Sequence, residues 1–108
     1  MRKTKKTTGK KIAQLQRVQR ILRSVENKVK AGYRAEIVGI FGSYARGQQK
    51  TGSDIDILVK FSSGATLFDF VGLADFLEEK LRLKVDLVTE RALRKELKDE
   101  ILHEVVAV

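Results

Sequence analysis

Cysteine is absent from the 108-residue chain, and histidine occurs only once. The absence of cysteine excludes disulfide bonds and thiolate metal sites. With a single histidine, carboxylates are the side chains that could form a metal site, and their oxygens favour Mg²⁺ or Mn²⁺ over Zn²⁺. No apolar run approaches the roughly 18 residues that span a bilayer, and no apolar segment follows the basic N-terminus. We therefore expect a cytoplasmic protein without a membrane segment.

Acidic residues are scarce at one end of the chain only. Residues 1–30 hold eleven Lys and Arg against one acid, whereas residues 31–108 hold eleven Lys and Arg against thirteen acids. The net charge of +8 therefore belongs to the N-terminal segment. Residues 1–11 have few apolar side chains and are expected to form a basic flexible tail. This tail is either solubilising or a contact for RNA or an acidic partner, although no aromatic residue is present there for base stacking.

The length of the chain predicts a single domain over residues 12–108, too small to include a separate domain for a large substrate. Apolar side chains recur at steps of three and four over residues 12–31, which predicts an amphipathic helix that ends at Gly32. The opposite face of this helix is basic and is either solvated or a surface for RNA or an acidic partner. Its members are Arg17, Arg20, Arg23 and Lys28.

Three short, β-branched segments, residues 36–41, 53–59 and 84–88, predict strands. The apolar residues of a helix expected over residues 66–81, among them Leu67, Phe68 and Val71, should pack on the sheet. The whole order predicts an α/β (α+β) fold in which helices flank a small mixed sheet.

A final helix is expected after Thr89, which can cap its first turn. This helix carries an apolar stripe with a spacing of four residues. The stripe either packs on the sheet, which we favour, or docks a partner helix. Its members are Leu93, Leu97, Ile101 and Val105.

The stretch FGSYARGQQKTGSDIDILV, residues 41–59, combines a glycine-serine turn with two acids. Ser43 is expected to cap a short helix whose free amides receive an anion, and Gly42 lets a phosphate approach the backbone. Arg46, one turn along, either reaches a phosphate oxygen or forms a structural ion pair. We therefore expect an anion site at this turn.

Asp54 and Asp56 lie two residues apart on a predicted strand, so both face the same side at a separation of roughly 6.6 Å. This spacing suits carboxylates that flank two cations about 3.5–4 Å apart. Hard cations need further oxygen ligands, and Asp86 on the next strand is the candidate, because Val85 and Leu87 face the other way. Each aspartate could instead be an exposed charge at a strand end.

Gly42-Ser43, ten further residues, Asp54-Ile55-Asp56 and a later strand with Asp86 together resemble the DNA polymerase beta-like nucleotidyltransferase superfamily. The strings GSYARG and SDIDILV resemble its minimal nucleotidyltransferase branch, and the likeness covers residues 33–106 as the catalytic core. Members of this branch are little more than the catalytic domain and are commonly paired with a helical protein of the HEPN class.

This resemblance implies transfer of a nucleoside monophosphate, expected to be AMP from ATP, to a hydroxyl group. Asp54, Asp56 and Asp86 would be the catalytic residues and would hold two Mg²⁺ ions, with Mn²⁺ as an alternative. Four residues would bind the nucleotide: Gly42, Ser43, Arg46 and Ser53.

The resemblance also implies a partner. The expected acceptor is a tyrosine of a HEPN toxin, which would make the chain a type VII-like antitoxin and part of a hetero-oligomer. Two alternatives stay open: a non-catalytic module that neutralises such a toxin by contact, and a nucleotidyltransferase that acts on a small molecule or an RNA end.

Overall fold

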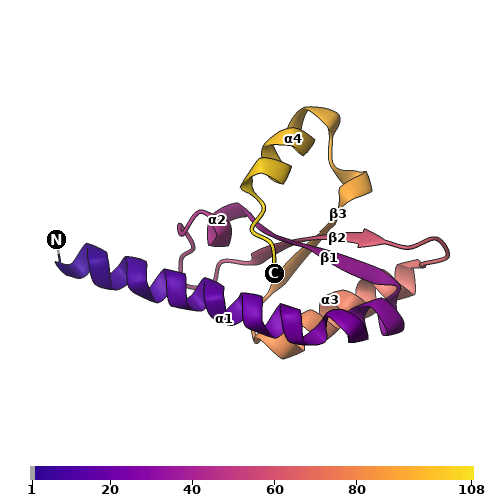
Figure 1. Ribbon diagram of the computed structural model, residues 1–108, viewed down its shortest axis with the longest axis horizontal. Helices are drawn as coiled ribbons and strands as arrows, with labels where there is room; N and C mark the ends of the chain where they lie inside the picture. The colour runs from indigo at the N-terminus through magenta and orange to yellow at the C-terminus, as the bar shows by residue number, and fades with distance from the viewer. Residues whose placement is uncertain (1) are drawn as a thin grey trace.

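The computed structural model of the chain describes the backbone of residues 2–108 and the side chains of residues 9–108. Helices and strands alternate along the chain in the predicted order (Figure 1). The elements are α1 (Arg2–Tyr33), β1 (Ala35–Phe41), α2 (Gly42–Ala45), β2 (Ile55–Phe61), α3 (Leu67–Leu81), β3 (Val85–Thr89), the 3₁₀ helix η1 (Glu90–Ala92) and α4 (Lys95–Glu104). The predicted α/β fold with a small mixed sheet is confirmed.

The sheet has three strands in the order β1-β2-β3. β1 runs antiparallel to β2, and β3 runs parallel to β2. Ile55, Ile57 and Val59 of β2 are fully buried, because alternate side chains of a strand point to the same face. Asp56 lies between two of them in sequence and therefore faces the opposite side of the sheet.

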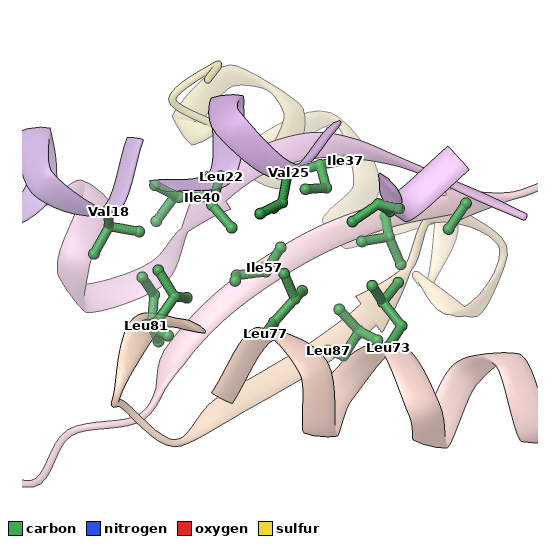
Figure 2. Packing of buried hydrophobic residues seen from close by; sticks show 14 of the residues in the cluster. Val18, Leu22, Val25, Ile37, Ile40, Ile57, Leu73, Leu77, Leu81 and Leu87 are labelled. Atoms are coloured by element: carbon green, nitrogen blue, oxygen red, sulfur yellow. The ribbon is translucent and has the colours of Figure 1, made fainter. Parts of the chain in front are cut away.

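The main core lies where α1 and α3 cover one face of the sheet (Figures 1 and 2). Both helices present apolar side chains to this face at steps of three and four, so each buries one stripe. The α1 stripe begins at Val18 and includes Leu22 and Val25, and the α3 stripe consists of Leu73, Leu77 and Leu81. In Figure 1, α4 lies on the other side of the strands from these two helices.

Helix α1 is longer than predicted at both ends. It begins at Arg2, so residues 2–11 continue the helix where a flexible tail was expected, and Met1 lies outside the described residues. No proline interrupts this segment, and its six Lys and Arg residues are good helix formers. Gly32 does not end the helix. The helix ends at Tyr33, and Arg34, the residue after it, has the left-handed backbone, at φ 54°. None of the helices in the described part of the chain is long and apolar enough to cross a membrane.

The basic face of α1 is partly used within the molecule. Arg17 donates to the carbonyl of Leu81 at 3.2 Å, and Arg23 donates to the carbonyl of Val108 at 2.7 Å. Arg20 is exposed, as is Lys28, whose ammonium group lies 5.6 Å from the ring centre of Phe76. This face is therefore neither uniformly solvated nor uniformly free for a ligand.

Helix α3 begins at a cap that Asp69 provides by accepting a hydrogen bond from the Thr66 N–H at 2.8 Å. The expected burial is wrong for three apolar residues near the start of α3, whereas Phe70 in the same region packs on Phe61 of β2, with ring centres 5.9 Å apart. Leu67 is 75% exposed, Phe68 90% and Val71 51%.

Helix α4 contains no buried residue. Thr89 does cap the segment before it, since its hydroxyl accepts from the Ala92 N–H at 3.2 Å, but only a 3₁₀ turn follows directly. Leu97 is 46% exposed, so the predicted packing of the whole stripe on the sheet is wrong. The reason is geometric: α4 is connected to the sheet mainly through its C-terminal end.

Truncation of the core side of α1 tests this arrangement. Because Leu22 is fully buried, Leu22→Ala should lower the free energy of unfolding by about 2–5 kcal/mol. Ile12→Ala is the control, because Ile12 is 51% exposed and its loss should cost about 0.5 kcal/mol or less. Urea titration followed by circular dichroism measures both, and equal losses would contradict the packing described here.

Candidate active site

Two carboxyl groups meet at the start of β2 and β3. Asp56 is the register partner of Asp86 in the parallel pair, so the two side chains lie next to each other on one face of the sheet. The carboxyl group of Asp86 acts on that of Asp56 and raises its pKa. Asp54 lies just before β2, and its charge also acts on Asp56. The structure therefore places Asp56 beside Asp86, with Asp54 near enough for its charge to act on Asp56.

The environment of Asp56 disfavours its charged form. Burial, then the charge and hydrogen bond of Asp86, and then the charge of Asp54 raise the pKa of Asp56 from 3.8 to about 6. Arg46 acts in the opposite direction and lowers this pKa. Asp56 is therefore a carboxylate with too little positive charge around it.

The glycine at the end of β1 lies directly against Asp56. Phe41 pairs with Asp56 across the antiparallel strands, and Gly42 follows with φ 73°. A Cβ atom on Gly42 would overlap the Oδ2 atom of Asp56. This position therefore needs glycine twice, for its left-handed backbone and for the space that the carboxylate occupies.

The two serines have structural contacts that differ from the expectation. Ser43 is not the N-cap of α2, because β1 runs to Phe41 and Gly42 is already the first helical residue. The Ser53 hydroxyl accepts a hydrogen bond from the Lys50 N–H at 2.9 Å, and this closes the turn that leads to Asp54. Nucleotide binding by either serine stays a prediction.

Arg46 forms an ion pair, which was one of the two alternatives. Its Nη1 atom donates to Oε1 of Glu104 at 2.7 Å, and its Nε atom donates to Gln48 at 3.0 Å. The Gly42 N–H donates to the same Glu104 oxygen, also at 2.7 Å. Sequence reasoning missed Glu104, because no signal in the sequence separates it from Glu100 or the other acids of α4.

Two further residues shape the site and were also missed. Tyr44 of α2 is 2% exposed, and burial followed by the charge of Asp54 raises the pKa of its hydroxyl. Gln49 is 5% exposed and donates from Nε2 to Gln14 of α1 at 3.1 Å. These contacts fix α2 and the loop after it against α1, so that the loop delivers Asp54 to the start of β2.

The donor set fits a hard divalent cation. Asp54, Asp56 and Asp86 offer only carboxylate oxygens, the ligands that Mg²⁺ and Mn²⁺ prefer. Within residues 9–108, however, no group of three acidic or imidazole side chains already stands in a metal-binding arrangement. The carboxylates would therefore need to adjust their side-chain angles around an ion.

The comparison with known families agrees with the geometry. The nucleotidyltransferase domain family matches residues 18–108, nearly all of the sheet and helices described above. The chain belongs to this family. It is accordingly a nucleotidyltransferase by family, and the match includes every residue proposed for the site.

The individual relatives belong to one group within the family, the protein adenylyltransferases. The protein adenylyltransferase MntA of Thermococcus cleftensis is 37% identical over 94 residues, which are 87% of this chain and 95% of that protein. A Methanocaldococcus jannaschii protein, provisionally named a protein adenylyltransferase, is 43% identical over 79 residues, 73% of this chain and 92% of its own. The chain is thus similar to protein adenylyltransferases over most of its length.

Solved structures similar to this chain also support the nucleotidyltransferase family. A structure provisionally described as a minimal nucleotidyltransferase matches with a TM-score of 0.68 and 39% identity, over 81% of this chain and 92% of that one. A crystal structure of a toxin-antitoxin with AMP-PNP matches with a TM-score of 0.52 and 32% identity, over 65% of this chain and 58% of that one. Both sequence and structure comparisons therefore show the nucleotidyltransferase fold and the minimal nucleotidyltransferase branch.

The raised pKa of Asp56 predicts a dependence of stability on pH. Between 3.8 and about 6 the folded protein holds a proton on Asp56 that the unfolded chain has lost. The resulting stability is fully present below pH 3.8 and is lost as the pH rises through about 6. Asp56→Asn, which cannot ionise, should therefore be more stable than the wild type at about pH 8, by about 1 kcal/mol after allowance for solvent screening.

The measurement is thermal unfolding in EDTA from about pH 4 to pH 8. The difference between variant and wild type should shrink toward acid pH. Asp75→Asn is the matched control, because Asp75 is exposed on α3 and loses the same charge. Equal melting temperatures for Asp56→Asn and wild type at about pH 8 would contradict the prediction.

Proposed function

We propose that this chain transfers AMP from ATP, with Mg²⁺, to a hydroxyl group of a partner protein, and that the partner is the toxin of a toxin-antitoxin pair. The acceptor we favour is a tyrosine of a HEPN-type helical toxin. The observation that carries the enzymatic part is the placement of Asp56 beside Asp86, with Gly42, the first residue of α2, directly against the Asp56 carboxylate. The partner rests on the relatives and on the sequence resemblance.

The geometry supports a division of labour among the residues. Gly42 and Arg46 offer an N–H and a guanidinium group to the oxygens of the triphosphate, and Ser43 and Ser53 border this position. Divalent ions held by Asp54, Asp56 and Asp86 would neutralise the triphosphate and lower the pKa of the acceptor hydroxyl. Asp86, exposed on β3, then takes the proton of that hydroxyl.

The chemical balance of the reaction is simple. The acceptor oxygen forms a bond to the α-phosphorus, the bond from that phosphorus to the bridging oxygen breaks, and pyrophosphate leaves. The proton of the acceptor moves to Asp86. Catalysis by the chain therefore consists of positioning, charge neutralisation and one proton transfer.

Several observations support a protein acceptor. The named relatives are protein adenylyltransferases, and one solved neighbour is a toxin-antitoxin structure with AMP-PNP. The exposed apolar side chains of α4, Leu97 and Leu102, lie on the helix whose end reaches the site, where a bound protein could contact both.

Transfer of labelled AMP tests the proposal. The chain is incubated with α-³²P-ATP, Mg²⁺ and the protein encoded beside it, and the label on each protein is measured. The partner should be labelled at a tyrosine, and Asp56→Asn should lower the rate roughly 10²–10⁴-fold. Asp75→Asn, an exposed aspartate on α3, is the matched control and should keep the wild-type rate.

Other outcomes separate the alternative functions. Neutralisation of the toxin that survives Asp54→Asn and Asp56→Asn together would favour a module that acts by contact. Label on RNA ends or a small molecule, with none on the partner, would favour the other class of nucleotidyltransferase. The second result would overturn adenylylation of a partner protein, and the first would show that neutralisation of the toxin does not depend on it.

A pair of glycine substitutions tests the geometry of the junction between β1 and α2 at Gly42. Gly42 and Gly47 have similar left-handed backbones, at φ 73° and 68°, so alanine strains both by about 1 kcal/mol or more. Only at Gly42 does the added methyl group meet Asp56, because nothing lies within 4 Å of a Cβ on Gly47. We expect Gly42→Ala to lose transfer at least about 10²-fold and Gly47→Ala to keep it. Equal activities would show that the contact with Asp56 is unimportant.

A further inference from the structure

The carboxylate of Glu104 lies on the donors that the proposed function assigns to the nucleotide. One oxygen of Glu104, the last residue of α4, accepts from the Gly42 N–H and from Arg46, both at 2.7 Å. This is the ion pair found within the described part of the chain, and it joins two residues that are 58 positions apart in the sequence. The carboxylate of Glu104 thus already occupies the position beside the Gly42 N–H and Arg46.

Backbone pairing holds Glu104 at this place. Just after it, Val106 forms two hydrogen bonds with Ile40 of β1, at 2.9 and 2.8 Å. Gly39 makes the approach possible, because a Cβ there would overlap the carbonyl oxygen of Val106. The next carbonyl, that of Ala107, accepts from Gln19 of α1 at 2.9 Å. The position of Glu104 is therefore built into the edge of β1 and does not depend on packing of α4.

We propose that Glu104 takes the place of a triphosphate oxygen in the free protein, and that the nucleotide must displace it to bind. This inference rests on the proposed function, which assigns Gly42 and Arg46 to the triphosphate. A carboxylate and a phosphate oxygen make the same charge-assisted hydrogen bonds, and one N–H cannot serve both at full strength. Glu104 is therefore an internal competitor of the substrate.

The contact is suited to exchange. The Glu104 side chain is 28% exposed and that of Arg46 is 48% exposed, so water can replace each partner. Helix α4 has no buried residue, so withdrawal of its last side chain opens no cavity in the core. The apparent affinity for nucleotide then equals the intrinsic affinity multiplied by the fraction of molecules whose Glu104 is withdrawn.

Binding of inorganic tripolyphosphate tests the competition without metal or nucleoside. The full-length chain is titrated in EDTA, and the NMR shift of the Gly42 amide reports binding. If about a tenth of the molecules have Glu104 withdrawn, Glu104→Ala should bind about tenfold more tightly than wild type. Glu100→Ala is the matched control, because it removes the same charge from an exposed position of α4 and should change affinity less than about twofold.

A second variant keeps every charge. Gly39→Ala should push residues 105 and 106 away from β1 and withdraw Glu104, so it should also tighten binding of tripolyphosphate. Gly32→Ala, in an exposed part of α1 with open space around it, is its control. Thermal unfolding of each variant shows whether it is folded, and Glu104→Ala decides the question if Gly39→Ala is not.

The outcomes separate this inference from the proposed function. Unchanged or weaker binding by Glu104→Ala, or no binding by any variant, overturns the competition, and weaker binding would make Glu104 a residue that positions Arg46. Tighter binding of tripolyphosphate by Glu104→Ala supports the competition. Absence of AMP transfer, with tighter tripolyphosphate binding by Glu104→Ala, would count against the proposed function alone.

Discussion

The arrangement of the whole site depends on the register of β2 against β3. That register places Asp56 opposite Asp86, and it is held by the residues on the other face of the same strands. Ile55 and Ile57 are fully buried there, and Leu87 nearly so. A slip by one residue would expose this apolar row and bury the carboxylates, so the hydrophobic core also specifies where the acids stand.

Repulsion between the acids is tolerated because the rest of the molecule leaves them little freedom. Burial of Tyr44 and the hydrogen bond between Gln49 and Gln14 tie the loop before Asp54 to α1. Protein sites that carry uncompensated charge are often functional, since the cost is recovered when a ligand supplies the missing charge. Under the proposed function, that ligand is a nucleotide with its divalent metal ions.

Sequence reasoning predicted the strands, the faces of β2 and the position of Asp86 on the strand beside Asp56, because each rests on a local period of two or on a spaced motif. It did not predict which apolar residues of α3 and α4 stay exposed. Phe68 and Leu97 lie in correct helical patterns, but their burial depends on whether another element covers them. A period identifies a stripe, and only the tertiary arrangement decides how much of that stripe is covered.

The contacts of Glu104 show the same limit more sharply. They arise from a pairing between Ile40 and Val106, residues far apart in the chain. They also need the absence of a side chain at Gly39, because the Val106 carbonyl lies where a Cβ would be. Ser43 was assigned as a cap because its residue type suits that role, but α2 already begins at Gly42, directly after β1. Neither outcome could be read from composition or spacing.

The buried tyrosine next to the acids gives the protein an internal optical probe. The chain has no tryptophan and only two tyrosines. Tyr33 precedes β1 and stacks on Phe76, with ring centres 5.3 Å apart, whereas Tyr44 follows β1 and feels the charge of Asp54. Any ion or substrate that neutralises Asp54 changes the field across one of two phenol chromophores, so the ultraviolet difference spectrum of the unlabelled protein reports directly on occupancy.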